Sequence, residues 1–230
     1  MKATQATEPD LRLIYQMLRQ RYGHRHWWPG ETRDEVVIGA ILTQGVSWRN
    51  VEQAIANLHH ENVYTLRDIH TAVPEALAPL LRPTLYFNQK ALRLKTFAAF
   101  VESEHGGSLS SMFAQEPQRL RARLLEIKGL GPETVDSILL YAGEQPFFVV
   151  DAYTDRLLTR LGYCVQPRNY DAWQRLITTR LPVDVELYKD LHAQIVHHCK
   201  VHCQRKPLCP SCPLSRLCPG GSGQDEIHGA

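Results

Sequence analysis

Apolar positions recur at helical spacing along most of the chain. Apolar side chains three and four positions apart mark one face of a helix, whereas a strand alternates apolar and polar residues. Helices of this kind are predicted over residues 9–19, 65–69, 74–81, 88–104, 108–114, 170–181 and 185–198. The sequence shows no convincing alternating pattern, so it predicts an all-α protein.

A central helix is predicted over residues 32–42. Thr32 and Glu35 at its start have the spacing of a capping box. The positions that follow are apolar on nearly every side, which is typical of a helix inside the core. Ser47 then caps a second, amphipathic helix. Gln44 is therefore predicted in a short turn between two buried helices, with its polar side chain free to project.

A glycine turn separates two further helices, predicted over residues 117–127 and 132–142. Gly129 and Gly131 allow positive φ and a close approach of the backbone to a ligand. Pro132 suits the first position of a helix. Backbone N–H groups at such a helix start are suited to a phosphate. From the residues alone, an ordinary helical turn fits this segment equally well.

Two other features remain open on the residues alone. Asp151 follows a short apolar run and fits the N-cap of a helix. Trp27 and Trp28 lie in a loop before Pro29, where they fit either a packing plug or a wall that stacks on a flat ring.

Charge places few limits on the partner. The net charge of +2 permits a polyanionic partner without requiring one. Lys90, Arg93 and Lys95 fall near the start of the helix over residues 88–104, and their charges predict a solvated face. We recognise no targeting segment and no run long enough to span a membrane. We therefore expect a cytoplasmic monomer without a membrane partner, nucleoid-associated if the source is bacterial.

Four cysteines near the C-terminus have the spacing Cys203-x5-Cys209-x2-Cys212-x5-Cys218. Their clustering is typical of metal ligation in a reducing compartment and not of a disulfide framework. Zinc sites usually contain two close cysteine pairs, and only one is present here. A [4Fe–4S] cluster is therefore the preferred prediction, with tetrahedral zinc as the alternative.

The glycine hairpin, the aspartate twenty residues beyond Gly131 and the cysteine loop together resemble the helix-hairpin-helix DNA glycosylases of the endonuclease III superfamily. The resemblance implies two helical domains with the active cleft between them. One is a six-helix barrel-like domain over residues 32–147, with the hairpin at about 117–142. The other combines residues 8–31 and 148–218 and carries the cluster. Disordered tails are predicted over residues 1–7 and 219–230.

The resemblance also implies roles for individual residues. Asp151 becomes the catalytic carboxylate, and Gln44 fills the gap that an extruded base leaves in DNA. Glu133 stands where the bifunctional members have a lysine that forms a Schiff base, so strand cleavage by that route is not expected. The residues expected to contact DNA are Gln44, Lys128, Gly129, Leu130, Gly131 and Thr134.

One branch of the superfamily, the 3-methyladenine glycosylases, resembles this chain most in its aromatic residues. The expected base pocket consists of Trp27, Trp28, Pro29 and Trp48. A cationic alkylated purine stacks well on tryptophan and is a good leaving group. We therefore expect a base-excision repair enzyme that flips a damaged base out of double-stranded DNA and hydrolyses its N-glycosidic bond, with a preference for alkylated purines.

Two alternatives are kept. The first is a bifunctional glycosylase and AP lyase that acts on oxidised pyrimidines. The second belongs to another class, a non-catalytic DNA-binding or redox-sensing protein on the same scaffold. Retention of Asp151 favours an enzyme, because a protein without activity has no need of that carboxylate.

Overall fold

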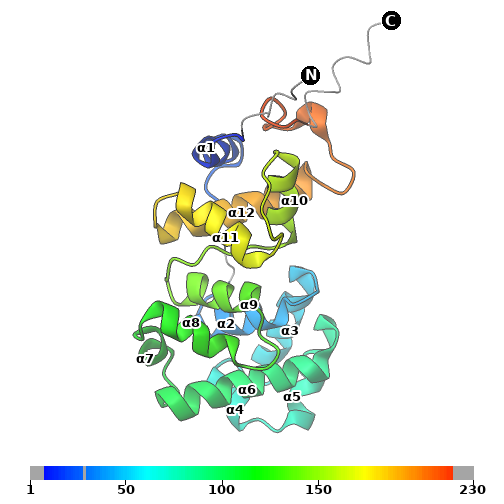
Figure 1. The fold of residues 1–230 in the computed structure, drawn as a ribbon. Coiled ribbons are helices and arrows are strands. Elements are labelled where there is room, and N and C mark those ends of the chain that lie inside the picture. Colours follow the sequence, from blue (N-terminus) through cyan, green and yellow to red (C-terminus); the bar gives the residue numbers. More distant parts are fainter. Residues whose placement is uncertain (1–7, 28–29, 220–230) are drawn as a thin grey trace, which may run out of the picture. The chain divides into compact units, whose positions relative to one another are not determined.

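The computed structural model describes residues 8–27 and 30–219, and every regular element within these ranges is helical (Figure 1). The all-α prediction is confirmed. By its internal contacts the chain divides into two compact units, residues 28–147 and residues 1–27 with 148–230. No helix in the described ranges is long and apolar enough to cross a membrane.

The unit of residues 28–147 contains a series of mostly short helices. They are α2 (Arg33–Leu42), α3 (Trp48–His60), α4 (Leu66–Thr71), α5 (Pro74–Leu80), α6 (Phe87–His105), α7 (Leu109–Phe113), α8 (Pro117–Leu125) and α9 (Pro132–Ser137). The 3-10 turn η1 (Arg82–Thr84) precedes α6, and the π-helical segment η2 (Ile138–Ala142) continues α9.

Helix α2 forms the centre of this unit, as its apolar sequence predicts. Every residue from Glu35 to Leu42 is buried, and the helix contacts α3, α6, α9 and η2 (Figure 1). The hydroxyl of Thr32 accepts a hydrogen bond from the Glu35 N–H at 3.2 Å. The Glu35 carboxylate accepts from the Glu31 N–H and not from that of Thr32, so one half of the predicted capping box forms. Ser47 stands at the N-cap of α3, but its side chain makes no capping hydrogen bond.

The second unit contains α1 (Leu11–Tyr22), α10 (Ala152–Arg160), α11 (Tyr170–Arg180), α12 (Val185–Val201) and the 3-10 turn η3 (Cys209–Ser211). Helix α12 is its core element and packs against α1 and α10. Side-chain hydrogen bonds hold α1 against α12. The Tyr15 hydroxyl donates to the buried Asp190 carboxylate at 2.9 Å, and the Tyr22 hydroxyl lies 2.9 Å from Nδ1 of both His198 and His202.

Candidate functional site

The glycine hairpin between α8 and α9 requires glycine at its first position. Gly129 has a φ of +94°, a conformation that side chains with a Cβ rarely adopt. A Cβ at this position would also come within 2.7 Å of the Arg93 Nε atom, which packs against the turn. A larger residue at 129 would therefore be strained by its backbone conformation and would require the Arg93 side chain to shift.

Gly131 differs from Gly129 in both respects. Its backbone is extended, with φ −92° and ψ 173°, and it stands at the N-cap of α9. A Cβ built here meets no atom within 4 Å. The protein's own fold therefore does not require glycine at 131, and the backbone there is exposed.

A salt bridge joins the two arms of the hairpin. The Arg121 guanidinium of α8 donates to both oxygens of the Asp136 carboxylate of α9, at 2.6 and 3.0 Å. The Asp136 side chain is fully buried. This pairing could not be predicted from the sequence, because the two partners lie in different helices.

The Gln44 side chain reaches this hairpin. Its Nε2 atom donates to the Gly129 carbonyl at 3.1 Å and to the Thr134 hydroxyl at 2.9 Å. Its Oε1 atom accepts a hydrogen bond from the Arg93 guanidinium. The prediction of a freely projecting side chain is therefore wrong, because donors and acceptors of the hairpin and of α6 satisfy the amide. The structure does bring together Gln44, Gly129 and Thr134, and their expected contact with DNA stays a prediction.

Two lysines of α6 contradict the predicted solvated face. The Lys90 ammonium is buried and donates to the carbonyls of Leu42, at 2.9 Å, and Thr84, at 2.5 Å. Burial, together with the positive charge of Arg93, lowers the pKa of Lys90 to about 8. Lys95 similarly donates to backbone carbonyls. These ammonium groups serve as caps for helix ends and turns, a role that charge patterning alone does not reveal.

The other predicted DNA-contacting residues differ in exposure. Lys128 and Glu133 are exposed, and Glu133 is the second residue of α9. The Leu130 side chain is buried, and its N–H donates to the Ile127 carbonyl at 3.1 Å. Leu130 thus anchors the turn to the core, while Lys128, Glu133 and the Gly131 backbone form its outer surface.

Asp151 caps α10, as its position predicts. Its Oδ1 atom accepts hydrogen bonds from the Thr154 N–H at 2.7 Å and the Thr154 hydroxyl at 2.9 Å. Its Oδ2 atom lies 3.6 Å from Nε2 of His192 on α12. Burial alone would raise the pKa of the Asp151 carboxyl, but His192 and the Thr154 hydrogen bonds outweigh it and hold that pKa below its usual range. A largely buried carboxylate is thus kept ionised.

The predicted base-pocket residues belong to different parts of the chain. Trp28 and Pro29 lie outside the described residues. Trp27 belongs to the unit with Asp151 and is partly exposed, with the Lys200 ammonium 5.4 Å from the centre of its ring. Trp48 opens α3 in the other unit and is also partly exposed. The pocket itself stays a prediction.

The cysteine loop after α12 encloses a cavity of about 280 Å³ lined by the four predicted ligands Cys203, Cys209, Cys212 and Cys218. A hydrogen bond from Cys199 and the nearby Arg160 guanidinium lower the pKa of Cys203 to about 6, which favours its thiolate. Cys199 itself does not line the cavity. Within the described residues, no three His, Cys, Asp or Glu side chains converge as they would around one metal ion. The metal or cluster that these thiols would hold stays a prediction.

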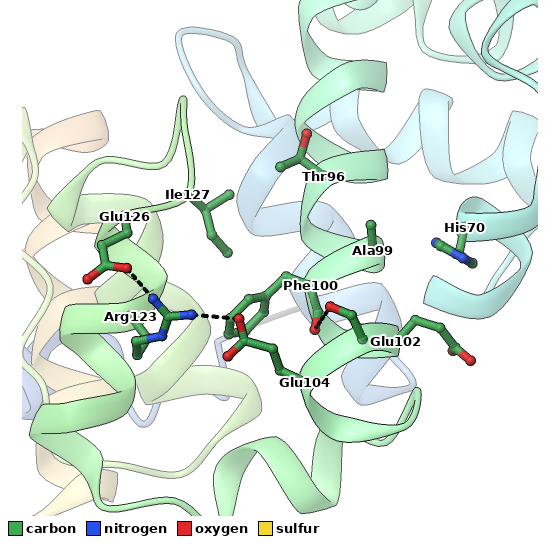
Figure 2. Close-up of a pocket in the computed structure, with 10 residues that line it drawn as sticks. His70, Thr96, Ala99, Phe100, Glu102, Glu104, Arg123, Glu126 and Ile127 are labelled. Carbon is green, nitrogen blue, oxygen red and sulfur yellow. Dashed lines mark hydrogen bonds and ion pairs between the residues drawn. The ribbon is translucent and has the colours of Figure 1, made fainter.

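A separate open groove of about 550 Å³ lies between α4, α6 and α8 (Figure 2). The Arg123 guanidinium on its wall pairs with the carboxylates of Glu104, at 2.6 Å, and Glu126. The groove contains none of the predicted site residues. Its one lining arginine is already neutralised, so the groove offers little attraction to a phosphate.

Comparisons with known proteins fit this geometry. The family model described as HhH-GPD superfamily base excision DNA repair protein matches residues 38–182. A relative from Methanocaldococcus jannaschii, named as a DNA repair glycosylase, is 46% identical over 206 residues, which cover 89% of this chain and 94% of the relative.

Solved structures of similar fold include two proteins with bound ligands. The H. pylori 3-methyladenine DNA glycosylase bound to 1,N6-ethenoadenine is 26% identical, with a TM-score of 0.71 over 82% of this chain and 96% of that one. An endonuclease III–DNA complex matches with a TM-score of 0.79 at 21% identity, over 94% of this chain and 97% of that one. The second likeness concerns the fold.

Proposed function

Because the chain belongs to the HhH-GPD superfamily of base excision DNA repair proteins and is a DNA glycosylase of that family, we propose that it is a monofunctional enzyme that removes alkylated purines from double-stranded DNA. The predicted resemblance to the endonuclease III superfamily is confirmed. The observation that carries the finer proposal is Glu133, an exposed carboxylate at the position where bifunctional members have the Schiff-base lysine.

The chemistry of Glu133 excludes one route. A Schiff base needs a nucleophilic amine, and a carboxylate cannot form an imine with the sugar. Lys128 lies on the turn, five residues earlier in the chain. We assign Lys128 to the DNA backbone, because an exposed ammonium on a turn suits a phosphate contact.

Asp151 is the proposed catalytic carboxylate. Cleavage of the glycosidic bond leaves positive charge on the sugar, and an ionised carboxylate either stabilises that charge or activates the attacking water. The hydrogen bonds from Thr154 and the contact with His192 support this role, because they keep the carboxylate ionised. Its additional N-cap role fixes the side chain at the start of α10.

The hairpin and Gln44 are the proposed DNA-binding elements. Backbone N–H groups around Gly131 and the Lys128 ammonium would hold the phosphates, which positions the enzyme without reading bases. The Gln44 side chain would exchange its contacts with Arg93 and Gly129 for the space left by the flipped nucleotide.

The substrate class is proposed from the aromatic residues. Trp27, Trp28, Pro29 and Trp48 are the expected stacking surface for the extruded base. A positively charged alkylpurine leaves readily, so it needs neither a lysine nucleophile nor strong acid catalysis. The likeness to a 3-methyladenine glycosylase supports this class.

Cys203, Cys209, Cys212 and Cys218 would hold a [4Fe–4S] cluster, with zinc as the alternative. When bound, the cluster would supply a rigid anchor for the loop and a one-electron redox centre. The chain's own contribution is the thiolate set and the Arg160 guanidinium, which lies 3.2 Å from the Cys203 sulfur. We further propose that the protein acts as a monomer.

The first test is a panel of duplexes that contain methylated purines, ethenoadenine, oxidised pyrimidines, deaminated bases and mismatches. We expect free base from the alkylated purines and a loss of about 10²-fold or more in Asp151→Asn. Asp171→Asn, which changes an exposed carboxylate in the same unit, should be unaffected. Release confined to oxidised pyrimidines would overturn the substrate class, and no release from any lesion would favour the non-catalytic alternative.

The second test is borohydride trapping on abasic DNA. The wild type should form no covalent adduct, because the position of the nucleophilic amine holds a carboxylate. Glu133→Lys should gain an adduct if this position faces the sugar as the family pattern implies. Efficient trapping of the wild type would show that another amine acts and would reject the monofunctional assignment.

A further inference from the structure

The two oxygens of the Asp151 carboxylate have different surroundings. Oδ1 accepts both hydrogen bonds from Thr154 and thereby completes the N-cap of α10. Oδ2 plays no part in the cap and faces Nε2 of His192 at 3.6 Å. Both side chains are well shielded, with 12% of Asp151 and 7% of His192 exposed.

The other aspartate caps in this unit lack this arrangement. Asp10 and Asp184 each accept one backbone N–H, from Arg12 and Leu187 at 2.9 Å, and both are exposed. An N-cap needs neither burial nor a donor from a distant helix. A buried carboxylate needs hydrogen bonds to stay ionised. Here His192 of α12 is a potential donor to Oδ2, the oxygen of Asp151 that takes no part in the cap.

We propose that His192 is a positioning residue for Asp151: its Nε2–H donates to Oδ2, which orients the carboxylate toward the sugar and keeps it ionised. The inference rests on the proposed role of Asp151 as the catalytic group. The distance of 3.6 Å is longer than a formed hydrogen bond. Catalytic contacts of this kind are often long without substrate and shorten in the reacting complex.

The chemistry of the pair assigns the His192 tautomer. An ionised carboxylate oxygen only accepts, so Nε2 must carry the proton. The ring is held edge-on to Phe148, with centroids 6.4 Å apart and planes at 89°, which restricts its rotation. Tyr188 of α12 packs on the same phenylalanine, and the Asp155 carboxylate of α10 accepts hydrogen bonds from Arg168 and Trp173.

The test compares two amides that differ in reach. His192→Gln places an N–H near the position of Nε2, whereas His192→Asn places it near that of Nδ1. In single-turnover release from methylated duplex, His192→Asn should lose about ten- to a hundred-fold in rate, and His192→Gln should stay within a few-fold of wild type. DNA affinity should not change in either variant, because His192 acts through Asp151.

A second readout does not depend on activity. The ¹³C resonance of the Asp151 carboxyl should titrate at higher pH in His192→Asn than in wild type or His192→Gln. Equal rates and equal titrations in the two variants would overturn the proposal, even if one of them loses stability. If the wild type releases no base but the titration still shifts, the proposed function fails and the His192 contact stands.

Discussion

At the scale of single residues, the two hairpin glycines differ: the fold itself favours glycine at 129, whereas the proposed phosphate contact is the reason for glycine at 131. Gly129 combines positive φ with the close approach of Arg93, whereas Gly131 has ordinary backbone angles and open space around it. The hairpin alone therefore tolerates a methyl group at 131 and not at 129. A phosphate held by the backbone N–H groups needs the space at 131.

Gly131→Ala should therefore weaken DNA binding without unfolding the protein. We expect a change in unfolding free energy within about 0.5 kcal/mol and a rise in the Kd for duplex DNA of roughly tenfold, about one hydrogen bond to a charged group. Urea unfolding and DNA titration at fixed salt measure the two effects. Gly129→Ala is the matched control and should lose stability. Unchanged DNA affinity in Gly131→Ala would contradict a phosphate contact at this backbone.

Lys90 predicts a dependence of stability on pH. Its pKa in the folded protein is about 8, against 10.5 for an ordinary lysine, so between these values the unfolded chain binds more protons than the folded one. The free energy of unfolding should therefore rise with pH in this window, whereas Lys90 adds no pH dependence below it, where both states are charged. Relative to Lys90→Met, the wild type should gain of order 1–3 kcal/mol between pH 8 and pH 10.5 in urea unfolding. If the unfolding free energies of the wild type and Lys90→Met change in parallel with pH, the Lys90 ammonium is not desolvated.

At the scale of elements, the hairpin is held by more than its turn. The Arg121–Asp136 pair ties α8 to α9 across Gly129 and Leu130, with both carboxylate oxygens satisfied. Removing Arg121 takes a bidentate, charged partner from a fully buried carboxylate, which is far more costly than loss of an exposed pair.

Arg121→Met should lower stability by about 3 kcal/mol, because the fully buried Asp136 loses its bidentate partner. Thermal unfolding should show a clear drop in Tm, and DNA affinity should fall as the hairpin loosens. Arg119→Met changes an exposed arginine of the same helix and should have little effect. Equal Tm values for the two variants would mean that another group compensates Asp136.

Local features of this fold were predictable from sequence because their physics is local. Apolar periodicity revealed α2 and α6, and the caps at Thr32 and Asp151 follow from residue type and spacing. The helix ends were less certain: α1 continues to Tyr22, where Gly23 with a φ of +70° stops it.

Contacts between distant segments were not predictable. Asp151 meets His192 only because α10 packs on α12, and Gln44 meets Thr134 because its turn lies beside the hairpin. The sequence predicts Lys90 as a surface charge, because the carbonyls that its ammonium contacts belong to other segments of the chain. Candidate residues can be named from motifs, but their partners depend on how helices far apart in the sequence pack.

At the scale of the whole molecule, the cysteine loop, which would hold the proposed cluster, has little secondary structure of its own. Between Val201 and Pro219 the only regular element in the described chain is the three-residue turn η3. The loop surrounds a cavity with sulfur atoms where a core would have packed side chains. We therefore expect the proposed cluster to stabilise the conformation of the loop, much as structural metals supply folding free energy elsewhere.

Loss of the cluster should consequently act on stability before it acts on chemistry. The purified protein should be yellow-brown with absorbance near ~400 nm. Cys212→Ser should lose that absorbance, lower the Tm and lose base release, whereas Cys164→Ser changes an exposed thiol outside the loop and should keep all three. Because thiolate ligation is the common requirement, iron and zinc analysis of the wild type decides between the two metals. A colourless, zinc-loaded protein with full stability would replace the cluster by zinc, and a metal-free protein with the same Tm would reject a structural metal altogether.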